Sequence, residues 1–119
     1  MASITEQAKQ LGNSLARTDE YQALKRAIEA ADDDRQIAEL RSELEKLEGT
    51  ISTALRAQQE PEKDDAEAYE AAVQKLQTNS TYQRLVAAQS NFDKVLQKVN
   101  QTISQGIQEG QDSKIILTS

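Results

Sequence analysis

The sequence predicts an all-α fold, an elongated antiparallel helical hairpin or bundle that oligomerises through its long helices. Apolar residues recur every three or four positions along most of the 119 residues, as they do on one face of a helix. Strand signals are scarce, because the chain has few valines, four glycines, one proline and no alternating β-branched run. Hydrophobic residues make up only 37% of the chain, which is enough for one apolar stripe per helix but thin for a deep globular interior.

The chain begins with two short helices, and a hydroxyl residue suited to capping precedes each of them. Ser3 can accept a hydrogen bond from the first turn, and Glu6 completes a capping box three residues later. Thr18 precedes Asp19 and Glu20, whose negative charges suit a helix amino terminus. We expect these short helices, before residue 32, to fold back on the longer ones.

The most regular pattern is a heptad-like seam in a helix predicted over about 34–58, with charged residues between its members. The aspartates at 32–34 are expected to cap this helix, since the glycine that a calcium loop requires is missing. The seam either packs inside the chain or forms an interface with a partner, and we expect one edge to do each. Its members are Ile37, Leu40, Leu44, Leu47, Ile51 and Ala54.

A polar turn around Pro61 is predicted to join this helix to a last helical segment over about 65–109. We expect a bend or short break at residues 79–81 and a helix end at Gly110. Residues 1–110 are expected to form one all-helical domain, and 111–119 a flexible or docked tail. The candidate core or interface residues of this last segment are Phe92, Leu96, Val99 and Ile103.

The predicted slender shape favours assembly of several copies of the chain. Long arms with apolar stripes on single faces cannot cover both sides of each arm by themselves. The sequence therefore predicts a homodimer or a higher homo-oligomer.

The composition argues against enzymatic activity and against a resident cofactor. The chain has no cysteine and no histidine, which removes thiolate metal sites, cysteine nucleophiles and the usual neutral-pH acid and base. Carboxylates are plentiful, but no pattern gathers two of them with an apolar pocket that would separate their pKa values. We expect no catalytic site, no metal and no cofactor.

The charge distribution argues against direct binding of nucleic acid. The net charge is −6, and residues 32–70 alone carry thirteen acidic and five basic residues, a net charge of −8. Residues 71–119 carry five basic and three acidic residues, a net charge of only +2. An RNA-binding accessory role is the hypothesis that this mildly basic segment leaves open. Its basic residues are Lys75, Arg84, Lys94, Lys98 and Lys114.

The start of the chain has no basic and apolar pattern of a secretory signal, and no apolar run is long enough to span a membrane. The sequence therefore predicts a cytoplasmic protein without membrane insertion.

Residues 15–25 (LARTDEYQALK), followed by an aspartate-led long helix and a proline-containing turn, resemble the bacterial YlbF/YheA family. The last segment is similar to the closing helix of that family, and the resemblance covers about residues 4–107. The YheA-type members are the most similar. The matching residues of the last segment are Tyr82, Leu85, Ala88, Gln89, Phe92, Leu96, Val99, Asn100 and Ile103.

The resemblance implies a small, all-helical, non-enzymatic cytoplasmic protein that self-associates or joins related subunits. Members of the family are regulatory factors in competence, sporulation and biofilm formation, and some assist the membrane-bound ribonuclease Y in processing messenger RNA. Some relatives hold iron–sulfur clusters through cysteines. That cofactor does not carry over, because this chain has no cysteine.

The sequence thus predicts a helical adaptor that presents apolar and acidic helix faces to protein partners, which include related subunits or ribonuclease-associated proteins. The alternative is a structural or chaperone-like helical bundle without a dedicated regulatory target. An adaptor binds a defined set of partners, whereas a chaperone-like bundle binds clients promiscuously.

Overall fold

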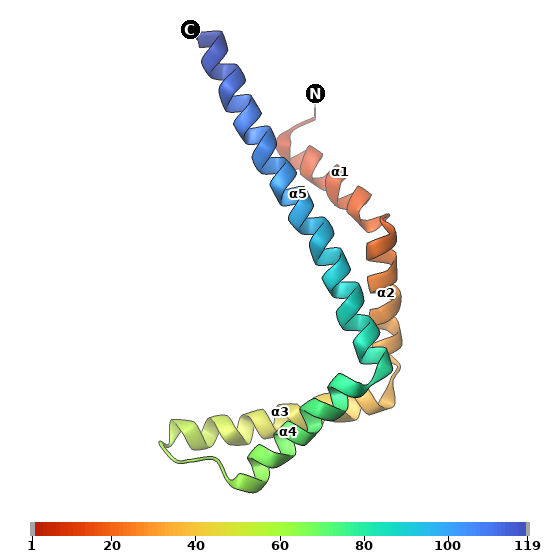
Figure 1. The fold of residues 1–119 in the computed structure, drawn as a ribbon, viewed down its shortest axis with the longest axis vertical. Helices are drawn as coiled ribbons and strands as arrows, with labels where there is room; N and C mark the ends of the chain where they lie inside the picture. The colour runs from red at the N-terminus through yellow and green to blue at the C-terminus, as the bar shows by residue number, and fades with distance from the viewer. Residues whose placement is uncertain (1, 119) are drawn as a thin grey trace.

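The computed structural model describes residues 2–118, and side chains through residue 111. This part of the chain contains five α-helices and no strand, which confirms the all-α prediction (Figure 1). The helices are α1 (Ile4–Ala16), α2 (Asp19–Asp32), α3 (Arg35–Arg56), α4 (Lys63–Thr78) and α5 (Ser80–Thr118).

Side-chain caps fix the starts of the first three helices, as predicted. The Ser3 hydroxyl accepts a hydrogen bond from the Glu6 N–H at 3.1 Å, and the Thr18 hydroxyl accepts one from the Tyr21 N–H at 3.2 Å. The Asp34 carboxylate accepts one from the Ile37 N–H at 3.0 Å. The aspartate run therefore ends in a helix cap.

The break expected at residues 79–81 is real, and it decides the shape of the molecule. Asn79 has an extended backbone, and its side-chain oxygen accepts a hydrogen bond from the Tyr82 N–H at 2.9 Å, which caps α5. The chain changes direction here, so α4 and α5 point away from each other (Figure 1).

Two arms result from this break. In the hairpin arm, α3 and α4 pack side by side around the turn that contains Pro61, which confirms the predicted hairpin. In the long arm, α5 packs against α2 instead of continuing along α3. The arms meet at an elbow, where α2 passes into α3 and α4 passes into α5 (Figure 1).

The predicted end of the last helix at Gly110 is wrong, because α5 continues through this residue to Thr118. Glycine ends a helix when it adopts a left-handed conformation, and no glycine in the described part of the chain has a positive φ. Gln58 adopts that conformation instead, with φ 59°, at the end of α3. The predicted docking of the tail concerns side chains beyond residue 111, which lie outside the described ones.

The buried core is small and lies at the elbow. We call its five buried residues the elbow cluster; three further residues, Leu44, Tyr82 and Leu85, pack against it half-buried. The side-chain amide of Asn79 donates a 2.7 Å hydrogen bond to the Gln36 side chain, which ties the break to α3. The elbow cluster consists of Ala31 from α2, Ile37 and Leu40 from α3, and Ala72 and Leu76 from α4.

The molecule is elongated, as predicted, with extents of 69 × 37 × 21 Å. Its radius of gyration is 22.1 Å, whereas a compact domain of this length has about 13.5 Å. Its accessible surface is 9595 Å², against about 6,400 Å² for a compact monomer of the same mass. The chain alone therefore leaves a large excess of surface in contact with solvent.

Candidate interaction surfaces

The predicted seam runs along α3 from the elbow towards the tip of the hairpin arm, and its burial decreases in that direction. Ile37 is fully buried and Leu40 is 5% exposed, both in the elbow cluster. The later members Leu44, Leu47 and Ile51 are half-buried. The elbow end of the seam thus packs inside the chain, and an interface role for its outer end stays a prediction.

An open apolar groove of about 400 Å³ lies beside the outer end of the seam, between α3 and α4. Leu55, which is 60% exposed, lines it together with Ile51 and Tyr69. The Tyr69 hydroxyl donates a 3.2 Å hydrogen bond to the Glu48 carboxylate. This bond, with the negative charge of Glu48, raises the pKa of Tyr69, because ionisation would place a phenolate beside a carboxylate.

The turn beyond this groove and the first part of α4 are strongly acidic. Residues 57–70 contain six acidic residues and a single basic one, Lys63. Lys63 forms an exposed ion pair with Glu67 at 3.9 Å, which leaves the turn with a large net negative charge. The groove therefore combines exposed apolar groups with one carboxylate in its lining, that of Glu48, and lies next to an acidic segment. The acidic residues are Glu60, Glu62, Asp64, Asp65, Glu67 and Glu70.

In the long arm, α2 and α5 pack through aromatic and small side chains. The rings of Tyr21 and Phe92 meet edge to face, with centroids 5.2 Å apart. Phe92 is thus a packing residue between the two helices. This geometry accords with packing rather than with stacking on nucleic acid bases.

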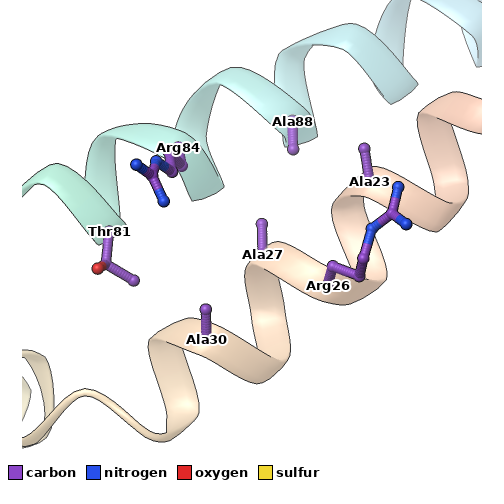
Figure 2. A pocket seen from close by; sticks show the side chains of 7 residues that line it. All are labelled: Ala23, Arg26, Ala27, Ala30, Thr81, Arg84 and Ala88. Carbon is purple, nitrogen blue, oxygen red and sulfur yellow. The ribbon is translucent and has the colours of Figure 1, made fainter.

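A second groove of about 400 Å³ lies between α2 and α5 near the elbow (Figure 2). Alanine side chains from the two helices point into the space between them, and the guanidinium groups of Arg26 and Arg84 lie at its sides (Figure 2). The methyl groups of this groove can pack against apolar groups, and its two guanidinium groups can attract acidic groups. Its lining contains one hydroxyl group, that of Thr81, and no carboxylate. The lining residues are Ala23, Arg26, Ala27, Ala30, Thr81, Arg84 and Ala88.

The far end of the long arm exposes the rest of the predicted stripe on α5. Leu96 and Val99 are half-buried, whereas Ile103 is 48% exposed and Ile107 is 67% exposed. The short helix α1, which packs against α2, contains no buried residue, and its Ile4 is exposed. This end of the molecule therefore carries apolar side chains that the chain does not cover.

The acidic residues Asp32 and Asp34 make structural contacts, an ion pair and a helix cap. The pKa of Asp34 is lowered, chiefly by the hydrogen bond from the Ile37 N–H. Hydrogen bonds with Asn79 and Thr81 lower it further, whereas desolvation of the carboxylate acts in the opposite direction. Asp32 lies 3.9 Å from Arg41 in an exposed ion pair. In the described part of the chain, no group of three or more acidic side chains is placed to hold a metal ion. None of its helices is both long and apolar enough to cross a membrane.

Sequence reasoning missed two features of these surfaces. Leu55 lies four residues after Ile51, so a step of four residues, beside the step of three to Ala54, would have found it. The groove flanked by Arg26 and Arg84 depends on α5 packing against α2. No periodicity in either helix reveals that pairing.

Comparison of the sequence with known proteins finds one matching protein family and several distant relatives. The family model described as "Control of competence regulator ComK, YlbF/YmcA" matches residues 4–108. A UPF0342 protein of Lactobacillus acidophilus is 25% identical over 109 residues, which cover 92% of this chain and 94% of the relative. A UPF0342 protein of Staphylococcus saprophyticus is 24% identical over 107 residues, which cover 90% of this chain and 94% of the relative. No solved structure shows a significant match to the chain.

Proposed function

Because the chain belongs to the YlbF/YmcA family, we propose that it is a non-enzymatic helical protein–protein interaction module that serves as a regulatory or adaptor factor in bacteria. The observation that supports this most is the apolar surface that the elongated chain leaves uncovered on both arms. Exposed apolar groups rimmed by charged residues are typical of protein interaction sites.

The hairpin arm is the surface that we assign to partner proteins. Its groove combines the exposed Leu55 with the half-buried Ile51, beside an acidic turn. Partners with a complementary apolar and basic surface fit this arrangement. By resemblance to the family, we propose that these partners belong to complexes that control competence, sporulation, biofilm formation or messenger RNA processing. They include related subunits and ribonuclease-associated proteins.

Affinity capture from the native bacterium, followed by mass spectrometry, tests this function. The informative variant is Leu55→Lys, which places a charge in the groove at a position where the side chain is already exposed. Ala38→Lys is its matched control, because Ala38 is exposed on the same helix near the elbow. We expect a defined set of proteins that the wild type and Ala38→Lys retain and that Leu55→Lys loses.

Two results would contradict the proposal. One is the same set of proteins with all three forms of the chain. The other is a mixture of unfolded clients that follows their abundance, which would favour the structural or chaperone-like bundle instead.

Substitutions in the seam, which lies beside the groove, are expected to have a larger effect on the hairpin arm. In the double variant Leu44→Lys, Leu47→Lys, two half-buried leucines become charged, and burying an ammonium group without a partner is costly. We expect the hairpin arm to unfold, visible as reduced helicity by circular dichroism, or its association to be lost, visible as a lower mass by light scattering. Unchanged melting and unchanged association would count against the seam.

A further inference from the structure

We propose that the groove between α2 and α5 on the long arm binds an acidic amphipathic helix of a partner protein, which forms a three-helix bundle with these two helices. The proposal rests on the proposed function and goes beyond it, since it gives the interaction module a second docking surface. Two observations support it: the groove is as long as a helix, and its sides are basic although the chain as a whole is acidic.

The groove near the elbow continues towards the far end of the long arm. A further groove of about 420 Å³ lies there, lined by the first turn of α2 and the middle of α5. On α5, Ala88 lines the groove near the elbow, and Asn91 and Val95 line the further one. On α2, Ala23 lines the first and Glu20 the second. Because these residues step by three or four along each helix, the two grooves follow one another on the same side of the helix pair. Together we call them the long-arm groove.

The length of the long-arm groove suits a helix. It follows α5 from Thr81 at the elbow to Val99, which is about 27 Å at about 1.5 Å per residue. A partner helix of about five turns would therefore fill it. Helix-in-groove recognition places the apolar face of such a helix on the floor and its polar flanks along the sides.

The floor of the long-arm groove suits the apolar face of that helix. Near the elbow it consists of alanine methyl groups from α2 and α5, which point into the space between the two helices (Figure 2). Farther along, the half-buried Val95 and Val99 continue it. Ala23 and Ala30 are exposed, although polar side chains usually cover the solvent face of a helix. Small side chains at these positions allow a third helix to pack close to both backbones.

The sides of the long-arm groove are basic in a chain whose net charge is −6. Glu20 supplies the only carboxylate of its lining. Among the side chains that the structure describes, no carboxylate lies within 4.0 Å of the cations of this groove. Acidic groups of a partner would therefore be attracted without breaking an existing ion pair. The cations are Arg26 and Arg84 near the elbow and Lys94 and Lys98 farther along.

The same lining favours an acidic helix over nucleic acid. Single-stranded nucleic acid binds where aromatic rings accompany a basic track, and the residues that line the long-arm groove include no aromatic ring. The methyl floor between cations instead matches apolar residues flanked by carboxylates. The two arms thus offer grooves of opposite character, since the groove of the hairpin arm lies next to an acidic segment.

Fluorescence anisotropy with a labelled synthetic helix tests the proposal. The probe is a stapled peptide of about five turns with leucines on one face and glutamates on both flanks, and the control peptide has lysines in place of the glutamates. We expect the wild-type chain to bind the acidic peptide in the micromolar range and the lysine peptide at least about 10-fold more weakly. Binding of neither peptide, or tighter binding of the lysine peptide, would overturn the proposal.

Charge reversal locates the bound peptide. The double variant Arg84→Glu, Lys98→Glu reverses one cation in each part of the groove. The double variant Lys46→Glu, Arg56→Glu is its matched control, because it makes the same charge change at exposed positions of α3. We expect the first variant to bind the acidic peptide at least about 10-fold more weakly, with unchanged helicity, and the control to bind it within about twofold of the wild type. Equal losses in both variants would mean that the peptide responds only to net charge, and would overturn the proposal.

A substitution in the floor tests the apolar contact without a change of charge. Ala30→Gln places a long polar side chain in the groove at an exposed position. Ala87→Gln is the control, since Ala87 is exposed on α5 and lies outside the long-arm groove. We expect Ala30→Gln to weaken binding of the acidic peptide about 5-fold and Ala87→Gln to leave it unchanged. Equal affinity of both variants would place the peptide outside the groove and contradict the proposal.

A labelled single-stranded RNA is the competing probe. If it binds the wild type more tightly than the acidic peptide does, and Arg84→Glu, Lys98→Glu removes that binding, the cations serve RNA and the proposal is wrong. The results also separate from those of the capture experiment. A chain that captures partners through Leu55 but binds no acidic peptide would keep the proposed function and lose this site. A chain that binds the acidic peptide in the long-arm groove and captures no defined partner would keep this site and contradict the adaptor function.

Discussion

The elbow and the far end of the long arm are built from similar apolar residues, yet the chain covers one and leaves the other open. At the elbow, three helices contribute to a cluster in which Ile37 is fully buried. At the far end, α5 runs beyond its contacts with α2, and Ile107 is 67% exposed. Side-chain hydrogen bonds also stabilise the elbow, where Asp34 and Asn79 cap the two helices that leave it.

This difference separates the residues that fold the single chain from those that are available for association. A substitution at the elbow removes packing that exists in every copy, so it is expected to change the stability of the monomer. A substitution at an exposed apolar position is expected to change assembly and to leave the monomer nearly intact.

The largest expected effect on stability comes from Leu40→Ala, with Leu55→Ala as its control on the same helix. Leu40 is 5% exposed in the elbow cluster, whereas Leu55 is 60% exposed near the hairpin turn. We expect Leu40→Ala to lower the free energy of unfolding by about 3 kcal/mol and Leu55→Ala by less than about 0.5 kcal/mol. Urea denaturation followed by circular dichroism measures both. Equal losses would show that the elbow is not the core.

A smaller effect is expected from Asn79→Ala, which removes the cap of α5 and the hydrogen bond to Gln36. We expect a loss of about 1 kcal/mol in the free energy of unfolding, the usual cost of a lost helix cap. Asn91→Ala, an exposed change within α5, is the control and is expected to cause no loss of stability, because alanine is the better helix former. If both variants melt like the wild type, Asn79 does not hold the elbow.

The smallest expected effect is the pH dependence that Asp34 contributes. Its pKa is lowered in the folded chain, chiefly by the hydrogen bond from the Ile37 N–H. The stabilisation is therefore present above the unfolded pKa of about 3.9, and it is lost as the pH falls through the lower folded pKa. Thermal melts of the wild type and Asp34→Asn across this acidic range should differ in slope. Parallel curves would contradict a stabilising role for the ionised carboxylate.

The sequence was informative where a local signal fixes the structure. Ser3, Thr18 and Asp34 cap the helices that they were expected to begin, because a capping side chain and the N–H that it binds are only three residues apart. The hairpin turn around Pro61 and the break at Asn79 are likewise local.

The pairing of helices was not predictable in the same way. The stripes of α2, α3 and α5 have the same spacing, so periodicity alone could not show that α5 leaves α3 and packs on α2. Gly110 failed as a stop signal because its effect depends on a backbone conformation that it does not adopt. A periodic pattern also does not specify what covers an apolar face. It therefore could not show whether the seam of α3 and the apolar residues at the far end of α5 belong to the core or to an interface.

Amide hydrogen exchange as a function of protein concentration compares the elbow with the apolar stripe of α5, formed by Leu96, Val99, Ile103 and Ile107, in one measurement. If a second copy covers the stripe, protection of the amides in residues 96–110 should increase as the concentration rises through the micromolar range. Protection at Ile37 and Leu40 should change far less, because each copy covers them by itself. Exchange in residues 96–110 that stays equally fast at every concentration would contradict the prediction that the chain self-associates through this part of α5.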